Sequence, residues 1–225
     1  MKKIPAFVIM FNRLTWPMAM CEFLADNGCE VVLVDNGSTY QPLLDWYGEC
    51  PYKLHRLPPI NEGAHKTPWT SGIIESYGSK RYIVTDHDLD LSNVPSDFLD
   101  VLKSGLEPSS AIKCGLSLKI DDLPENELTK RVLRIESGYW GKANDAGFYH
   151  APIDTTLALY DAERTRGCND KTFFNALRTP NPYTARHLPW YNTPENLTSE
   201  ERFYLQSIKN NGFWSHEYKR IFGNV

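Results

Sequence analysis

Three aspartates, Asp86, Asp88 and Asp90, alternate along the chain directly after the strand-like run YIVT at residues 82–85. Alternate residues of an extended segment point to the same side, so the three carboxylates are predicted to share a face. Like charges this close repel one another unless a positive group lies between them. Mg²⁺ and Mn²⁺ prefer carboxylate oxygens and usually share them with phosphates and water. A solvated acidic turn is the alternative, and the position at the end of a strand favours a metal.

The elements that must position these aspartates are predicted by an alternation of strand and helix patterns. Apolar or β-branched runs predict strands at 4–10, 30–35, 53–57 and 81–86, and helix patterns fall between them at 16–28, 40–48 and 67–78. This alternation implies an α/β fold, a Rossmann-like domain with a mostly parallel sheet flanked by helices. In such sheets ligands bind at the carboxyl ends of the strands.

Polar residues collect in the loops that would meet at that edge. Asn12 and Arg13 follow the first strand, Asp35 ends the second, and Asn61 lies in a later loop. The arginine could bind phosphate through a charge-assisted hydrogen bond, and Asp35 could accept from a ribose or a pyrimidine N–H. The alternatives are a surface arginine, a βα turn built by Asp35 and Gly37, and a simple loop around Asn61.

Three segments in order, VVLVDNGST, NEGA and DHDLDL, resemble the sugar-nucleotide half of GT-A glycosyltransferases, especially family 2. That family has a strand ending in D-[DN]-x-S, an N-x-G segment before a helix, and a D-x-D after the fourth strand. The resemblance covers residues 4–102, nearly half of the chain. The D-x-D pair is either Asp86 with Asp88 or Asp88 with Asp90, and Asp88 belongs to both.

The resemblance implies a metal-dependent transfer of a sugar from a nucleotide-sugar, such as a UDP-sugar, to an acceptor hydroxyl with inversion. It implies that Asp35 contacts the base and that Asn61 holds the donor near its ribose or phosphates. The aspartates would carry Mn²⁺ or Mg²⁺, which stabilises the departing diphosphate as a Lewis acid. The acceptor would be a glycan, free or linked to a lipid or a protein.

The second half of the chain is predicted to complete the same single domain, with residues 1–105 binding the nucleotide-sugar and residues 106–225 binding the acceptor. Strand patterns lie at 111–120 and 153–161, and a helix at 199–210. The last helix is predicted to begin with a capping box formed by Thr198 and Glu201.

Two side chains of this half are candidates for the site. Inverting transfer needs a general base, and Asp154 is our candidate, with Asp121, Asp122 and Glu136 as rivals. In the predicted loop at 185–192, the resemblance implies that His187 is a further metal or phosphate ligand. A histidine satisfied within the core is the alternative.

Composition excludes several other classes. The formal net charge of −4 gives no basic field for nucleic acid. Five cysteines, odd in number and without a CxxC pair, indicate reduced thiols and a cytoplasmic protein. No stretch approaches the roughly 20 apolar residues of a transmembrane helix.

Two rival functions share this fold. A sugar-nucleotide nucleotidyltransferase would normally have a glycine-rich phosphate loop after the first strand, and FVIMFNRLTWP contains no glycine. A catalytically silent carbohydrate-binding protein is the other rival.

Overall fold

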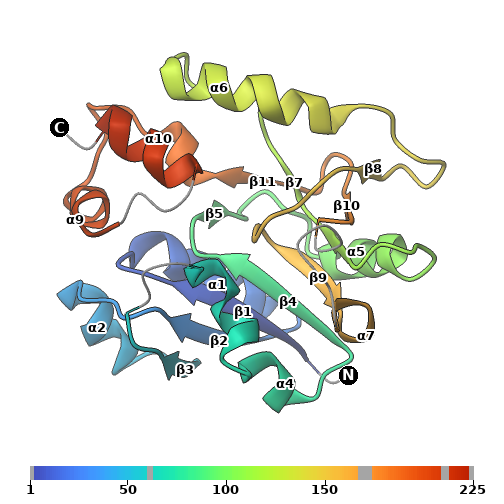
Figure 1. The fold of residues 1–225 in the computed structure, drawn as a ribbon, viewed down its shortest axis with the longest axis horizontal. Coiled ribbons are helices and arrows are strands. Elements are labelled where there is room, and N and C mark those ends of the chain that lie inside the picture. Colours follow the sequence, from blue (N-terminus) through green and yellow to red (C-terminus); the bar gives the residue numbers. More distant parts are fainter. Residues whose placement is uncertain (1–2, 60–62, 167–173, 209–212, 223–225) are drawn as a thin grey trace.

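The computed structural model of the chain describes residues 3–59, 63–166, 174–208 and 213–222. Within them, a central sheet has the strand order β3-β2-β1-β4-β9-β6-β10-β8 (Figure 1). Its strands are β1 Ile4–Met10, β2 Cys29–Asp35, β3 Lys53–Arg56, β4 Arg81–Asp86, β6 Lys113–Gly115, β8 Tyr149–His150, β9 Ala158–Asp161 and β10 Ala176–Arg178. The first four strands are parallel, β9 runs antiparallel between β4 and β6, β6 and β10 are parallel, and β8 is antiparallel to β10. The predicted α/β class with a mostly parallel sheet is confirmed.

The register of the parallel strands brings the ends of three of them to one edge of the sheet. Strand β1 pairs Met10 with Asp35 of β2, and Ile9 with Asp86 of β4. Because these strands run in the same direction, the loops that follow them gather beyond this edge. Asn12, Asp35 and Asp86 therefore belong to one end of the sheet.

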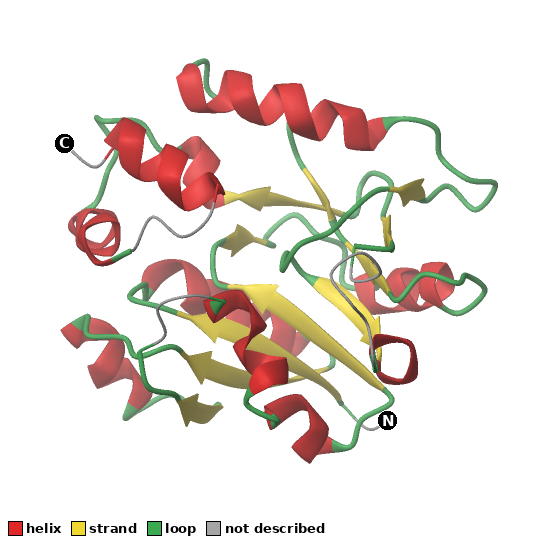
Figure 2. Cartoon of the chain, viewed as in Figure 1, coloured by secondary structure: helices red, strands yellow, loops and turns green. Residues whose placement is uncertain are grey.

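Strand β1 is buried because helices cover both faces of the central sheet (Figure 2). Alternate side chains of the strand enter two different apolar clusters. Val8 belongs to the cluster that includes residues of α1 (Thr15–Asp26) and α5 (Phe98–Leu106), and Phe7 belongs to the cluster with α4 (Ile73–Tyr77). An apolar run without alternation is expected of such a strand.

A second sheet of three short strands has the order β5-β11-β7. It consists of β5 Leu89–Asp90, β11 Thr184–His187 and β7 Ser117–Leu118. Strand β5 follows β4 after a bend, so this small sheet continues from the edge where the aspartates lie.

The remaining helices complete the layers around the two sheets. They are α2 Gln41–Tyr47, α3 Thr67–Thr70, α6 Glu127–Glu136, α7 Ala162–Thr165, α9 Ser199–Ser207 and α10 Phe213–Phe222, with 3-10 turns η1 Ala64–Lys66, η2 Ser137–Trp140 and η3 Leu188–Tyr191. Across the described ranges, no helix combines the length and the apolar character needed to cross a bilayer.

Several predicted elements are confirmed, and others are wrong for local reasons. The strands predicted at 4–10, 30–35, 53–57 and 81–86 agree with β1 to β4 within a residue. The helix predicted at 67–78 is divided into α3 and α4, because Gly72 has a left-handed φ of 74°.

The strand predicted at 111–120 leaves the central sheet halfway and continues in the small one. Ser117 marks the change, since its N–H donates to Thr179 Oγ1 at 3.1 Å and its hydroxyl donates to the Thr179 carbonyl at 2.5 Å. The strand predicted at 153–161 begins only at Ala158. The predicted loop at 185–192 is instead strand β11 followed by the turn η3.

The predicted start of the last helix is partly confirmed. Thr198 Oγ1 accepts the Glu201 N–H at 3.1 Å, as a cap should, but the Glu201 carboxylate does not complete the capping box and binds Arg13 instead. The helix predicted at 199–210 is observed as α9 over Ser199–Ser207, and residues 209–210 lie outside the described residues.

Candidate functional site

The loop after β1 is held by Asn12, which has a left-handed φ of 48°. Its side-chain oxygen accepts the backbone N–H groups of Thr39 at 2.7 Å and Tyr40 at 3.0 Å. Its own N–H donates to Ser38 Oγ at 3.0 Å. Asn12 is buried, and its oxygen joins the loops that follow β1 and β2. In this structure its hydrogen bonds organise the edge of the site.

Asp35 lies beneath the surface of the same edge, with no exposed area. Its carboxylate accepts hydrogen bonds from the Ser38 hydroxyl, from Tyr47 OH at 3.0 Å and from Arg56 Nε at 3.4 Å. Burial and the Asp35 charge raise the pKa of Tyr47. The Arg56 side chain is 52% exposed, so it presents a cation to solvent directly above the buried carboxylate. Sequence reasoning missed Arg56.

Asp86, the last residue of β4, is tied to the segment that precedes β9. Its Oδ2 accepts the Thr155 hydroxyl at 2.6 Å, and its N–H donates to the Thr155 carbonyl at 2.8 Å. Burial, followed by the charges of Asp88 and Asp154, raises the pKa of Asp86 to about 8. Asp154 itself is exposed. The predicted base and the first aspartate of the cluster therefore belong to one group of carboxylates.

Asp88 is buried and its two oxygens have different surroundings. Oδ2 accepts Arg13 Nη1 at 3.1 Å. Oδ1 has no hydrogen-bond partner among the described residues and lies 3.6 Å from His187 Nε2. Burial opposes ionisation of Asp88, but His187 and Arg13 outweigh it and hold the pKa of this carboxyl below its usual value. Asp88 is therefore an ionised carboxylate with one oxygen available.

Arg13 is enclosed by the C-terminal part of the chain. Its Nε and Nη2 donate to Glu201 at 2.6 and 2.9 Å, and its guanidinium carbon lies 3.5 Å from the ring centre of Tyr204. Burial opposes its charge, but Tyr204, Glu201 and Asp88 together raise its pKa. Only 1% of its side chain is exposed, so in this structure its donors serve Glu201 and Asp88.

His87 lies between the two aspartates and is neutral at physiological pH. Burial, then the charge of Arg13, lowers the pKa of His87 to about 4. With Nδ1 placed 2.7 Å from the carbonyl oxygen of Ile9, the neutral ring donates from Nδ1. The ring therefore fastens the loop after β4 to β1.

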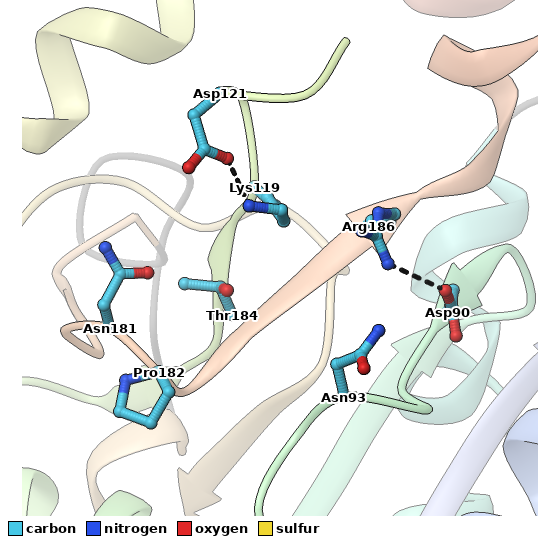
Figure 3. A pocket seen from close by; sticks show the side chains of 8 residues that line it. All are labelled: Asp90, Asn93, Lys119, Asp121, Asn181, Pro182, Thr184 and Arg186. Carbon is cyan, nitrogen blue, oxygen red and sulfur yellow. Dashed lines mark hydrogen bonds and ion pairs between the residues drawn. The ribbon is translucent and has the colours of Figure 1, made fainter.

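Asp90 takes a separate direction from Asp86 and Asp88. Its Oδ1 accepts the Ser92 N–H at 2.9 Å, and its Oδ2 lies 3.5 Å from Arg186 Nη1 (Figure 3). The pair lies on neighbouring strands, where Arg186 of β11 is opposite Asp90 of β5. The three aspartates thus have three different principal partners, Thr155, Arg13 and Arg186.

His187 of β11 reaches back to the site across the small sheet. Burial is the largest influence on its pKa, which is lowered, so its imidazole is biased toward the neutral form that ligates metals. Its ring centre lies 4.6 Å from that of Trp190, and its Nδ1 has no hydrogen-bond partner within the described ranges.

These groups can be tested for their fit to a divalent ion. In the described part of the chain, no set of three His, Cys, Asp or Glu side chains is already arranged around a metal position. Mg²⁺ commonly takes only one or two protein carboxylates and completes its shell with phosphate and water. The available oxygen of Asp88, with the Asp86 carboxyl beside it, fits that second pattern.

The site also contains residues that sequence reasoning did not select and one that the structure does not describe. Glu201 is predicted from the sequence only as part of a helix cap, and Thr155 is not selected at all. No local pattern distinguishes either, since their partners are far along the chain. Asn61 lies outside the described residues.

Comparison with known proteins adds little to this geometry. No protein-family model matches the chain, and no curated protein does so either. Among solved structures, HddC from Yersinia pseudotuberculosis is similar at a TM-score of 0.47 and 12% identity, over 80% of this chain and 91% of HddC. A likeness this weak carries no information about chemistry.

Proposed function

We propose that the chain is a metal-dependent glycosyltransferase that moves a sugar from a nucleotide-sugar, a UDP-sugar in the first instance, to an acceptor hydroxyl. The observation that supports this most is Asp88. It is a buried, ionised carboxylate with one oxygen that no described residue hydrogen-bonds, at the edge where Asp35 and Asp86 also lie. An unpaired buried acceptor is costly, which favours a site that a ligand completes.

We assign the holding of the cation to Asp86, Asp88 and His187. When bound, Mn²⁺ or Mg²⁺ would stabilise negative charge on the departing nucleoside diphosphate. Arg13 keeps Asp88 ionised, and Asp86 has to lose its proton before it can act as a ligand. Asp90, with its own partners Ser92 and Arg186, is left out of this assignment.

The nucleotide would lie over the loops after β1 and β2. Asp35 is fully buried and its oxygens are hydrogen-bonded within the protein. We therefore assign the contact with the nucleotide to Arg56, which Asp35 holds in place. The half-exposed guanidinium of Arg56 suits a phosphate or ribose oxygen. Asn12 shapes this wall by holding the backbone of Thr39 and Tyr40.

Asp154 is our candidate for the general base. It is exposed and close enough to Asp86 to influence the ionisation of that carboxyl. In an inverting transfer, Asp154 would take the proton of the acceptor hydroxyl while that oxygen attacks the anomeric carbon.

Calorimetric titration with UDP and with GDP, each with and without Mn²⁺, tests the donor half. We expect metal-dependent binding of one nucleotide that is lost in Asp88→Asn. Because Asp88→Asn also disturbs Arg13, Asp86→Asn serves as a second variant, since an amide replaces a protonated carboxyl with little change in shape.

Asp90→Asn and Asp100→Asn are the matched controls. Asp100 is 80% exposed on α5 and is not part of the aspartate cluster, so its replacement should leave nucleotide binding unchanged. Retained binding in Asp90→Asn would support Asp86 and Asp88 as the metal pair. Absence of metal-dependent binding in the wild-type protein would overturn the proposal. Nucleotide binding with sugar binding but no turnover would indicate a silent carbohydrate-binding protein.

A further inference from the structure

A separate pocket of about 460 Å³ opens beside the small sheet. Figure 3 shows its side chains converging from several segments of the chain. It is lined chiefly by Asp90, Asn93, Lys119, Asp121, Asn181 and Arg186. A pocket of this volume is large enough for a small-molecule ligand.

The charges of the lining cancel one another. Lys119 is paired with Asp121, and Arg186 lies 3.5 Å from Asp90 and 2.6 Å from Asp122. An anionic ligand would have to compete with these carboxylates for the two cations, and a cationic ligand would have to compete with the cations for the carboxylates. Neither gains a net electrostatic attraction from the lining.

The neutral part of the lining both donates and accepts hydrogen bonds. Asn93 and Asn181 each carry an amide with both functions, and Thr184 adds a hydroxyl. Pro182 supplies an apolar surface, and the described residues of the lining include no aromatic side chain. This combination suits a neutral ligand with many hydroxyl groups more than an apolar, aromatic or charged one.

The pocket adjoins the aspartate site through the backbone. Asp90 is two residues beyond Asp88, and the Leu188 N–H donates to the Asp88 carbonyl at 2.9 Å. Strand β11 carries Arg186 in the pocket and His187 at Asp88, on opposite faces of the strand. The pocket and the site proposed for the donor therefore share strand β11 and the segment from Asp88 to Asp90.

We propose that this pocket binds a neutral monosaccharide unit, which serves as the acceptor or as the part of an acceptor glycan nearest the reaction. Its role as an acceptor site rests on the proposed function, whereas its preference for a neutral, hydroxyl-rich ligand rests on the lining alone.

Saturation-transfer difference NMR on the full chain tests this assignment. The probes are the methyl glycosides of glucose, galactose, mannose and N-acetylglucosamine, with glucose 6-phosphate and glucuronic acid as charged comparisons. Asn93→Leu places an apolar side chain in the lining, and Ser104→Leu, at an exposed position of α5 outside the lining, is the control. Thr184→Val removes one hydroxyl while it keeps the shape of a β-branched side chain.

We expect at least one methyl glycoside to bind, about tenfold more weakly in Asn93→Leu and with reduced affinity in Thr184→Val, but normally in Ser104→Leu. The proposal is overturned if no neutral glycoside binds, if a charged probe binds more tightly, or if Asn93→Leu and Ser104→Leu behave alike. The same preparations are titrated with UDP and GDP in Mn²⁺. Glycoside binding without nucleotide binding would defeat the glycosyltransferase proposal and leave the pocket assignment standing.

Discussion

The substitution Glu201→Gln tests whether the buried ion pair with Arg13 holds the site together. Glu201 is 2% exposed and accepts Arg13 Nε at 2.6 Å, Arg13 Nη2 at 2.9 Å, Tyr218 OH at 2.7 Å and Asn192 Nδ2 at 3.2 Å. A glutamine offers one oxygen and turns an NH₂ group toward other donors. Arg13 would then keep its burial and lose most of its compensating charge.

The loss of stability follows from the guanidinium charge that Glu201 no longer balances. Removing one partner of a buried ion pair costs about 3–5 kcal/mol, because the other charge stays out of water. Asp88 still contacts Arg13 at 3.1 Å and supplies part of the compensation, so we expect the lower end, about 3 kcal/mol. For a chain of this size, each kcal/mol shifts the melting midpoint by about 2–4 °C, which gives a decrease of about 6–12 °C.

Urea denaturation followed by circular dichroism, and a thermal scan, measure the effect. Asp100→Asn, at the exposed end of a surface pair with Lys103, is the control and should leave the midpoint unchanged. The double variant Arg13→Met with Glu201→Gln should lose less free energy of unfolding than the sum of the single variants. The reasoning is refuted if Glu201→Gln unfolds at the same midpoint as Asp100→Asn.

Three further outcomes are expected. Asp86 has a pKa raised from 3.8 to about 8, so the metal-free folded state binds an extra proton between these values and loses stability as pH rises. The pKa of His87 is lowered from 6.5 to about 4, and this acts in the opposite sense only below pH 6.5. With a chelator present, the urea midpoint should therefore decline as the pH rises from 6.5 to 8, and Asp86→Asn should remove this decline. Gly37→Ala should destabilise by about 1–3 kcal/mol in urea, because φ is 79° and the added Cβ would meet Pro59 at 2.7 Å. Asn12→Ala should cost about 1–3 kcal/mol through two unmet N–H groups, whereas an unchanged midpoint would contradict the role given to its oxygen.

The sequence was sufficient to predict the edge of the sheet at which the polar residues gather. The runs at 4–10, 30–35 and 81–86 are apolar because each strand is buried, and burial of a parallel strand leaves this signal in the sequence. Once those strands are parallel and in register, the residues that follow them must lie near one another. The positions of Asn12, Asp35 and Asp86 follow from that alone.

What the three aspartates do there could not be predicted, because their partners are distant in the sequence. Asp88 meets Arg13 across 75 residues, Asp86 meets Thr155 across 69, and Asp90 meets Arg186 across 96. The extended-segment argument also fails at His87, where the chain bends between β4 and β5. The small sheet was missed for another reason, since β5 and β7 have two residues each and are too short to show periodicity.

The contact between Arg13 and Glu201 also sets the time at which the site can form during synthesis. The two residues are 188 positions apart. At ribosomal rates, roughly 10–40 s pass between the emergence of the first and the second. The neighbouring Glu200 accepts the N–H groups of Leu14 and Thr15 at 3.1 Å. The carboxylate that binds the start of α1 therefore comes from the same late segment. A nascent chain that ends before α9 would therefore carry strands β1 to β4, yet its Arg13 would have Asp88 without the carboxylate of Glu201.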